Sequence, residues 1–327
     1  MSYIAWVCVA AIASVCIVSA EPTLVFSKDD LPQFRERVET GENARVWAEV
    51  LAEAEALCDP NSSSFASPEK LDAMPAGEVR IGVLAHRFGR RLIDWMEAIG
   101  FAYQMTGDER FAAHGVELLV AASERLPVTD PRVGPAFAGA RGDIMRGLAV
   151  GYDWLGEAMT PEQKRQWADT SAAYVRNILT EANRDGTWWV PYHNFMGVAV
   201  GAAGCLALEL REFYPEEADG WLAESTDLVR RWLDEGFDDQ GAYFEGTGYS
   251  VYGLTDAVLF AEALRRDGGE NLFMHPHLLR VPDFYAMSVL PGEWVLEARN
   301  DANYGGLTNP LVLRLVGAQD SGLAKWL

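Results

Sequence analysis

The sequence predicts an all-α fold in which antiparallel helix pairs form a double ring. Apolar residues recur at helical spacing in almost every segment after residue 28, and no alternating run of strand length stands out before residue 285. Turns with Pro, Gly, Thr or Asp separate the helical segments, as at Thr160-Pro161, which is typical of a helix start. Long aromatic-rich loops between certain pairs favour a ring over a bundle or a solenoid, because such loops converge on one face of a ring.

The helices are expected in the following order. The first begins at the acidic turn 29–32, and its apolar face continues from Val38 through Val46 to Ala54. A loop rich in Pro, Ser and Asn follows, from residue 59 to about 75. Later helices are predicted at 87–106, 109–125, 141–158, 161–183, 194–213, 215–235, 247–266 and 276–290. The stretches 284–295 and 311–316 fit a strand or a helix equally.

Composition narrows the possible functions. The chain has 327 residues, of which 49% are hydrophobic, so it is long enough to bury a large core. Its net charge of −21 argues against nucleic acid as a partner and disfavours long-range attraction of densely sulfated polyanions. A protein of this charge that binds an acidic sugar must concentrate its positive charge inside a cleft. The sequence does not indicate an oligomeric state.

The first twenty residues read as a signal peptide. They contain no Asp, Glu, Lys or Arg and end in the small-x-small pattern Val18-Ser19-Ala20. We therefore expect a secreted or periplasmic protein with no membrane span after removal of the leader, and a single helical domain over residues 21–327. Cys58 and Cys205 remain in the mature chain, far apart in sequence, and allow at most one disulfide. There is no Cys/His cluster at metal-ligand spacing, so no metal cofactor is expected in this segment.

The first candidate site is the run 187–197 (TWWVPYHNFMG), which precedes a small-residue helix over 198–208. The aromatic side chains are candidates for stacking on sugar rings. His193 and Asn194 fall near the start of the helix, where free N–H groups and partial positive charge favour anions. A simpler interpretation is that Asn194 is only a helix cap and His193 a turn residue. The substrate-binding candidates in this run are Trp188, Trp189 and Tyr192.

The second candidate site is the glycine- and tyrosine-rich run 238–253, directly before another helix. Glycine lets a backbone turn sharply or approach a ligand closely. Tyr249 and Tyr252 are three positions apart and share a helix face, and Glu245 precedes them. A glycine-rich turn with tyrosines packed in the core is the equally weighted alternative.

Two weaker groups are also candidates for substrate binding. Arg141 begins a helix and would bring positive charge to a cleft, although a surface salt bridge explains it as well. The polar run 299–306 contains Arg299, Asn303 and Tyr304, and is either a loop on the same face or only a turn.

Three motifs in this order resemble the heparinase II/III-like family of polysaccharide lyases, which includes enzymes of alginate lyase and heparinase type. They are GYDWL at 151–155 followed by TPE at 160–162, YHNF at 192–195, and EGTGYSVYG at 245–253. The similarity spans most of residues 30–310. The resemblance implies an incomplete (α/α) toroid followed by a β-sandwich domain, with the substrate between the two. We expect the present chain to stop before that second domain.

The resemblance also implies β-elimination at a uronic acid in an acidic polysaccharide. Asn194 matches the asparagine that neutralises the uronate carboxylate, with His193 as its neighbour or substitute. Tyr249 matches the tyrosine that acts as general base, general acid or both. A further histidine of the family comes from the β-sandwich and has no counterpart here. This scheme requires no metal.

The residue types suit such chemistry, and two other functions compete with it. Donors around the uronate carboxylate would stabilise the enolate-like charge that develops when the C5 proton leaves. Tyrosine, with an ordinary pKa near ~10, needs a cationic neighbour to act as a base. A glycoside hydrolase would instead pair Glu245 with Asp238, Asp239 or Asp143. A non-catalytic glycan-binding protein is the third candidate.

Overall fold

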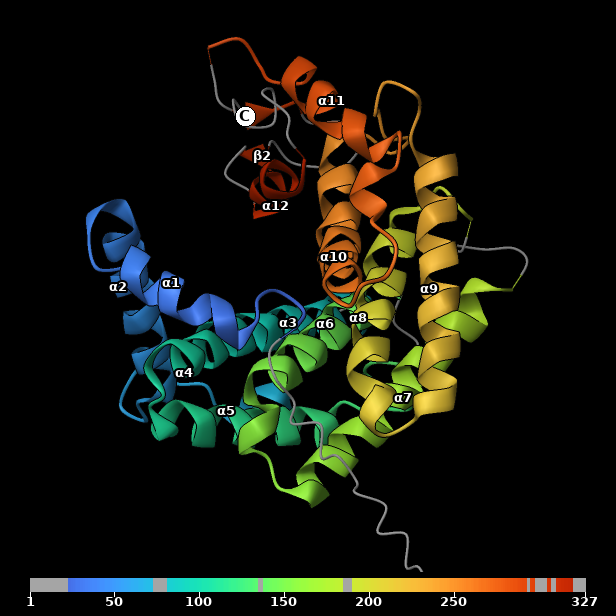
Figure 1. The fold of residues 1–327 in the computed structure, drawn as a ribbon. Coiled ribbons are helices and arrows are strands. Elements are labelled where there is room, and N and C mark those ends of the chain that lie inside the picture. The colour runs from blue at the N-terminus through green and yellow to red at the C-terminus, as the bar shows by residue number, and fades with distance from the viewer. Residues whose placement is uncertain are drawn as a thin grey trace, which may run out of the picture.

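The predicted all-α class is confirmed by a computed structural model, whose described residues are mainly helical and include one short strand pair (Figure 1). It describes residues 23–72, 81–134, 138–184, 190–292, 295–297, 305–306 and 310–319. The expected leader over 1–20 therefore lies outside the described residues. The two strands, β1 (Val295–Leu296) and β2 (Gly305–Gly306), pair antiparallel.

The helices in chain order are α1 (Leu31–Arg37), α2 (Gly41–Cys58), α3 (Ile81–Trp95), α4 (Phe101–Thr106), α5 (Glu109–Arg125), α6 (Ala138–Leu155), α7 (Pro161–Ala182), α8 (Gly201–Glu209), α9 (Pro215–Gly236), α10 (Thr247–Arg266), α11 (Val281–Met287) and α12 (Pro310–Ala318). A π-helical turn, Met96–Gly100, joins α3 to α4. A second one, Met196–Val200, leads from the helix start at Asn194 into α8.

Four helices, α3, α6, α8 and α10, pack side by side as an inner layer, and α5, α7 and α9 lie behind them. The contacts across the inner layer are unusually close. A Cβ at Gly142 would lie 2.8 Å from Val198 Cγ1, and one at Gly197 would lie 2.5 Å from the carbonyl oxygen of Gly253. In both pairs the second residue follows the first by 56 positions. The same offset recurs along each contact, at Gly139 against Phe195 and at Gly201 against Ala257, so α6, α8 and α10 run in the same sense.

This parallel arrangement decides where the loops lie. The segments that lead from an inner helix to the next outer one are short, at 156–160 and 210–214. The segments that lead back to an inner helix are longer, at 126–137, 183–193 and 237–246. The described parts of the longer segments therefore lie at the N-terminal ends of the parallel inner helices, on the same face of the fold. The direction of the helices also changes along the chain, since α3 and α6 cross the middle of Figure 1 whereas α9 and α10 stand upright beside each other. That the array is an incomplete toroid remains a prediction.

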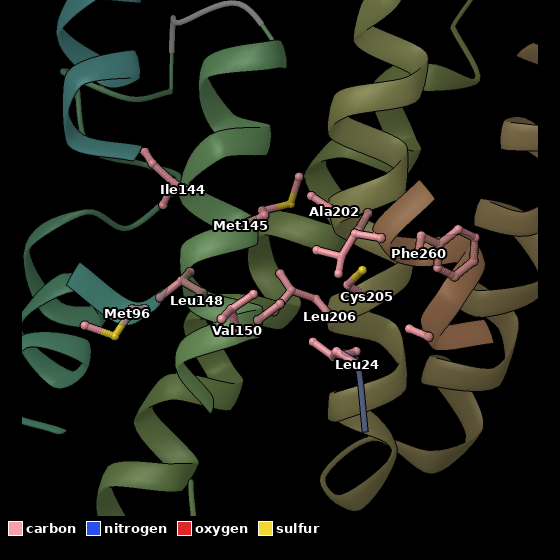
Figure 2. Close-up of a cluster of buried hydrophobic side chains, with 14 of the residues drawn as sticks. Leu24, Met96, Ile144, Met145, Leu148, Val150, Ala202, Cys205, Leu206 and Phe260 are labelled. Atoms are coloured by element: carbon pink, nitrogen blue, oxygen red, sulfur yellow. The ribbon is translucent and has the colours of Figure 1, made fainter. Parts of the chain in front are cut away.

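The core lies between the two layers and between the inner helices. Figure 2 shows side chains of α6 and α8 interleaved, with Phe260 of α10 and Leu24 of the N-terminal segment at the edge of the cluster. The rings of Tyr152 and Trp167 stack on each other in the same core, with their centroids 3.8 Å apart. The small-residue helix predicted at 198–208 is buried over nearly its whole length, as expected. Cys58 and Cys205 are both free thiols.

Several predicted elements need correction. The predicted first helix is in fact two helices, because the chain turns at Gly41, whose φ of +69° favours glycine. Consistent with that break, Val46 is exposed rather than part of a continuous apolar face. The segment 276–290 is a 3-10 turn (Leu278–Arg280) followed by the short α11, after which Val289 forms a β-bridge with Leu296. The ambiguous stretch 311–316 is helical.

None of the described helices combines the length and the apolar character that crossing a bilayer requires.

Candidate active site

The two sequence clusters meet at the N-terminal ends of the inner helices. A Cβ at Gly253 would lie 3.4 Å from the backbone carbonyl oxygen of Asn194. Tyr249 lies one helical turn before Gly253, on the same face of α10. Extended by one turn, the register that joins Gly197 to Gly253 would pair Tyr249 with His193. The structure thus brings the second cluster, through Glu245 and Gly253, against the helix start at Asn194.

Glu245 connects the two clusters directly. Its Oε2 atom accepts hydrogen bonds from the backbone N–H of Asn194 (2.7 Å) and from Asn194 Nδ2 (2.9 Å), and it lies 2.9 Å from the Tyr243 hydroxyl. Its Oε1 atom lies 3.8 Å from His193 Nε2. A carboxylate at a helix N-terminus is stabilised by the free N–H groups and the helix dipole. Glu245 therefore caps the helix that begins at Asn194 and orients the Asn194 side chain.

Asn194 lies beneath the surface of this face, with 1% of its area exposed. One N–H of its amide is used by Glu245, whereas its Oδ1 atom is buried and has no hydrogen-bond partner among the described residues. Buried polar atoms are nearly always paired, so this oxygen is a candidate to bind a ligand or a water molecule.

His193 is held in one tautomer by its neighbours. Its Nδ1 atom accepts the backbone N–H of Phe195 (3.2 Å), and the two rings pack with centroids 4.3 Å apart. When His193 is neutral, the proton is therefore on Nε2, the atom that faces Glu245. Burial lowers the pKa of His193, and the Glu245 carboxylate opposes that shift. The imidazole is consequently a neutral donor near pH 7.

The two tyrosines of α10 have different surroundings. Tyr249 is half-buried in the first turn of the helix. The Tyr252 hydroxyl is buried, has no hydrogen-bond partner among the described residues, and would lie 2.6 Å from a Cβ at Gly139. Burial raises the pKa of Tyr252 well above its ordinary value, and the Asp143 and Asp256 carboxylates raise it further. Tyr252 therefore keeps its proton.

A charged group beside Tyr252 was missed by sequence reasoning. His86 Nδ1 lies 2.5 Å from Asp143 Oδ2, and the His86 ring centroid is 6.1 Å from that of Tyr252. Arg90 Nε is 3.9 Å from the same carboxylate oxygen, and the Arg90 side chain is 64% exposed. The spacing of His86 and Arg90, one turn apart on α3, was visible in the sequence. Their partner Asp143 lies on α6, and the sequence did not indicate that these helices bring the three side chains together.

An open cavity of about 1010 Å³ lies against α3, α6 and α10, and Arg90 and Tyr252 form part of its wall. Its wall also carries Arg146, which pairs with Glu97 (2.5 Å) and Asp256 (3.5 Å). Burial raises the pKa of Asp256 to about 7, although the Arg146 guanidinium opposes the shift. Among the arginines of the wall, Arg90 is the exposed one, because Arg146 and Arg314 are mostly buried.

The remaining predicted site residues lie in varied places. Arg141 is buried and its guanidinium binds Glu181 (2.8 and 2.6 Å) and Asn177 (2.5 Å), so its charge is neutralised inside the protein. Tyr192 is exposed on the loop before Asn194. The other predicted substrate-binding residues fall outside the described part of the chain: Trp188, Trp189, Arg299, Asn303 and Tyr304.

The carboxylates considered for a hydrolase are held by other interactions. Asp238 Oδ1 accepts the backbone N–H groups of Gln240 (2.9 Å) and Ala242 (2.8 Å) and so stabilises its own turn. Asp239 is exposed in the same turn, and Asp143 binds His86 on the neighbouring helix. Within the described ranges there is no group of three or more His, Cys, Asp or Glu side chains arranged to hold a metal ion.

Comparison with known proteins gives a distant relationship to a lyase. The chain is 21% identical over 270 residues to an exo-oligoalginate lyase of Saccharophagus degradans. The match covers 77% of this chain but 34% of the relative, so the chain spans about a third of that enzyme's length. No protein-family model matches the chain. The chain is thus distantly related to a polysaccharide lyase, while the heparinase II/III-like family remains a prediction.

Proposed function

We propose that this protein is a polysaccharide lyase that cleaves a uronic-acid-containing polysaccharide by β-elimination. Tyr249 is the general base and acid, and Asn194 and His193 neutralise the uronate carboxylate. The observation that supports this most directly is the close register of α8 and α10, in which Gly197 meets Gly253 one turn below these residues. We further propose that the protein is exported with the leader over residues 1–20.

The reaction needs three things from the chain. A base removes the C5 proton of the uronate, the C5 electrons form a double bond to C4, and the C4–O bond breaks with a proton going to the leaving oxygen. Neutral donors beside the carboxylate stabilise the charge of the intermediate, and the second N–H of Asn194 and the Nε2–H of His193 are such donors. The parallel helix N-termini add a favourable potential for an anion on the same face.

The environment favours Tyr249 over Tyr252 as the base. Tyr252 is buried beside Asp143 and Asp256, which keeps it protonated. Tyr249 is half-buried, and the packing of Gly197 against Gly253 is the observation from which we infer that it lies near His193. The exposed guanidinium of Arg90 acts to lower the pKa of Tyr252, one turn further along α10, and we propose that the same cation favours a tyrosinate at Tyr249.

We infer the substrate class from the net charge of the protein and from the name of its relative. With a net charge of −21, the protein suits uronans of moderate charge density better than densely sulfated chains. The relative is named for its action on oligoalginate, so oligoalginate is the first substrate to test, with hyaluronan second.

The decisive experiment compares the wild-type chain with Tyr249→Phe. Elimination creates a conjugated unsaturated uronate, whose ultraviolet absorbance reports turnover. We expect Tyr249→Phe to abolish this absorbance while glycan affinity stays within a few-fold, because the ring remains and only the hydroxyl is lost. Tyr214→Phe, on a distant surface where the hydroxyl bonds Asp169 (2.5 Å), is the matched control and should keep full activity.

Three outcomes would contradict the proposal. Undiminished turnover in Tyr249→Phe would remove this residue from the mechanism. New reducing ends without the unsaturated product would show hydrolysis. Glycan binding by the wild-type chain without either product would show a binding protein.

A further inference from the structure

Phe244 is the most exposed large apolar side chain of the described residues, at 73%. It lies against the ring of Tyr192, which is 39% exposed, with centroids 4.9 Å apart and ring planes at 57°. The two residues come from different loops, those before α10 and before the helix start at Asn194. Together they present an apolar aromatic surface to solvent, which is unfavourable unless something binds there.

The backbone beneath this surface is rigid, so the exposure of Phe244 does not come from a loose loop. Phe244 N donates to Gly236 O (3.0 Å), and Gly246 N donates to Tyr243 O (2.9 Å). Tyr243 is buried, with its ring against Trp232 and Phe237.

The same buried tyrosine ties the second loop to the first. The Tyr243 hydroxyl lies 2.8 Å from Tyr192 O and 2.9 Å from Glu245 Oε2, and it accepts the indole N–H of Trp232 (3.2 Å). Both aromatic residues are therefore held in fixed positions. Pre-ordered aromatic rings bind a flat ligand with little loss of conformational entropy.

The position of the pair relates it to the candidate active site. Tyr192 directly precedes His193, and Phe244 directly precedes Glu245, which binds Asn194. A polysaccharide that places one uronate at His193 and Asn194 has neighbouring sugar rings within reach of this surface. The C–H face of a pyranose ring is the kind of surface that stacks on aromatic rings.

We infer that Tyr192 and Phe244 form a subsite for a sugar ring adjacent to the reacting uronate, and that this subsite makes longer chains bind more tightly than short ones. The identity of the polysaccharide rests on the proposed function, but the subsite itself is defined by binding. Phe244 has no polar group, so it recognises the ring face rather than the carboxylate.

The test measures affinity by calorimetry for a single uronate and for oligoalginates of increasing length. It uses the Tyr249→Phe chain, so that the ligand is not consumed. We expect Phe244→Ala in this background to weaken binding of the longer oligosaccharides about tenfold, or about 1.4 kcal/mol. The affinity for the single uronate should change less than twofold, because it has no ring for the subsite, and Phe244→Trp should restore the affinity for longer chains. Met287→Ala, which removes another exposed apolar side chain (67% exposed) on α11, should change no affinity.

Two results would overturn the subsite: no loss in Phe244→Ala, or an equal loss at every chain length. A change of oligomeric state in Phe244→Ala without a length-dependent loss would also overturn it, because the surface would then bind protein. The two proposals fail in different measurements. If the lyase proposal is wrong, the chain with Tyr249 intact forms no unsaturated product. If the subsite is wrong, the affinities do not change as described, whatever the activity.

Discussion

The behaviour of single side chains at this site depends on how each one is paired. Glu245 was considered as a substrate contact or a hydrolytic carboxylate, yet its Oε2 atom accepts two hydrogen bonds from Asn194. Hydrogen bonds to a charged group contribute about 1.5–3 kcal/mol each, so this carboxylate is strongly held. Arg141 was predicted to serve the cleft and is instead paired with Glu181. Arg90, which sequence reasoning did not select, keeps its guanidinium largely in solvent.

We expect Arg90→Ala to lower kcat/KM for uronate substrates by roughly ten- to a hundredfold, because a cation beside the tyrosines favours both the substrate carboxylate and a tyrosinate. Arg90→Lys should recover part of the loss. Arg87→Ala, an exposed arginine on the same helix, is the control and should match the wild type. Initial rates of unsaturated product formation measure the effect, and equal rates for the Arg87 and Arg90 variants would exclude a role for Arg90.

Among the helices, the inner layer depends on glycine. At Gly197 and Gly201 of the α8 segment a Cβ would lie 2.5 Å from Gly253 O and 2.7 Å from Ala257 N, both backbone atoms that cannot move aside cheaply. This close approach sets the register of α8 against α10. The register in turn brings the start of α10 next to Asn194. The small residues thus position the site although they do not touch it.

Gly197→Ala should lower the free energy of unfolding by about 1–3 kcal/mol, since the added methyl group would push the two backbones apart. It should also reduce lyase activity, because the packing of Gly197 against Gly253 sets the position of α10, the helix that contains Tyr249. The matched control is Gly220→Ala on the exposed face of α9, where no atom lies within 4 Å of the new Cβ. That change should stabilise the helix by up to about 1 kcal/mol. Urea unfolding monitored by circular dichroism measures the free energy of unfolding of both variants. A Gly197→Ala protein as stable as the wild type would refute this packing.

Taken as one molecule, the protein buries several acidic groups as well as exposing many. Burial raises the pKa of Asp256 to about 7 and that of Asp153 to about 7. Asp153 accepts hydrogen bonds from the backbone N–H groups of Thr23 (2.6 Å) and Leu24 (3.2 Å), so it binds the N-terminal segment to α6. Groups whose folded pKa exceeds the unfolded value make a protein more stable at lower pH.

The pH dependence of stability tests this directly. The ordinary pKa of Asp256 is 3.8 and its folded value is about 7, so its contribution is full below the unfolded value and is lost as pH rises through the folded one. The loss is at most about 4 kcal/mol. Asp256→Asn should therefore flatten the fall in unfolding free energy between about pH 4 and pH 7. An unchanged slope would show that Asp256 does not carry a raised pKa.

Local patterns predicted much of the secondary structure. The bounds of α5 (Glu109–Arg125) and α10 (Thr247–Arg266) agree with the sequence prediction to the residue. Asp108 caps the first of these through a hydrogen bond to Arg110 N (2.9 Å). Caps and helical periodicity act over one or two turns, so the order of residues along the chain contains them. The break at Gly41 was missed because apolar spacing continues on both sides of it.

The sequence by itself determined the helical class, most helix bounds and the two clusters that contain His193 and Tyr249. Only the tertiary structure decided that Glu245 binds Asn194, that Asp143 joins His86, and that Phe244 faces solvent. The physical reason is separation along the chain. Each of these pairings joins residues more than fifty positions apart, and their choice depends on how parallel helices pack. The exposure of Phe244 likewise depends on a turn fixed by contacts with another loop.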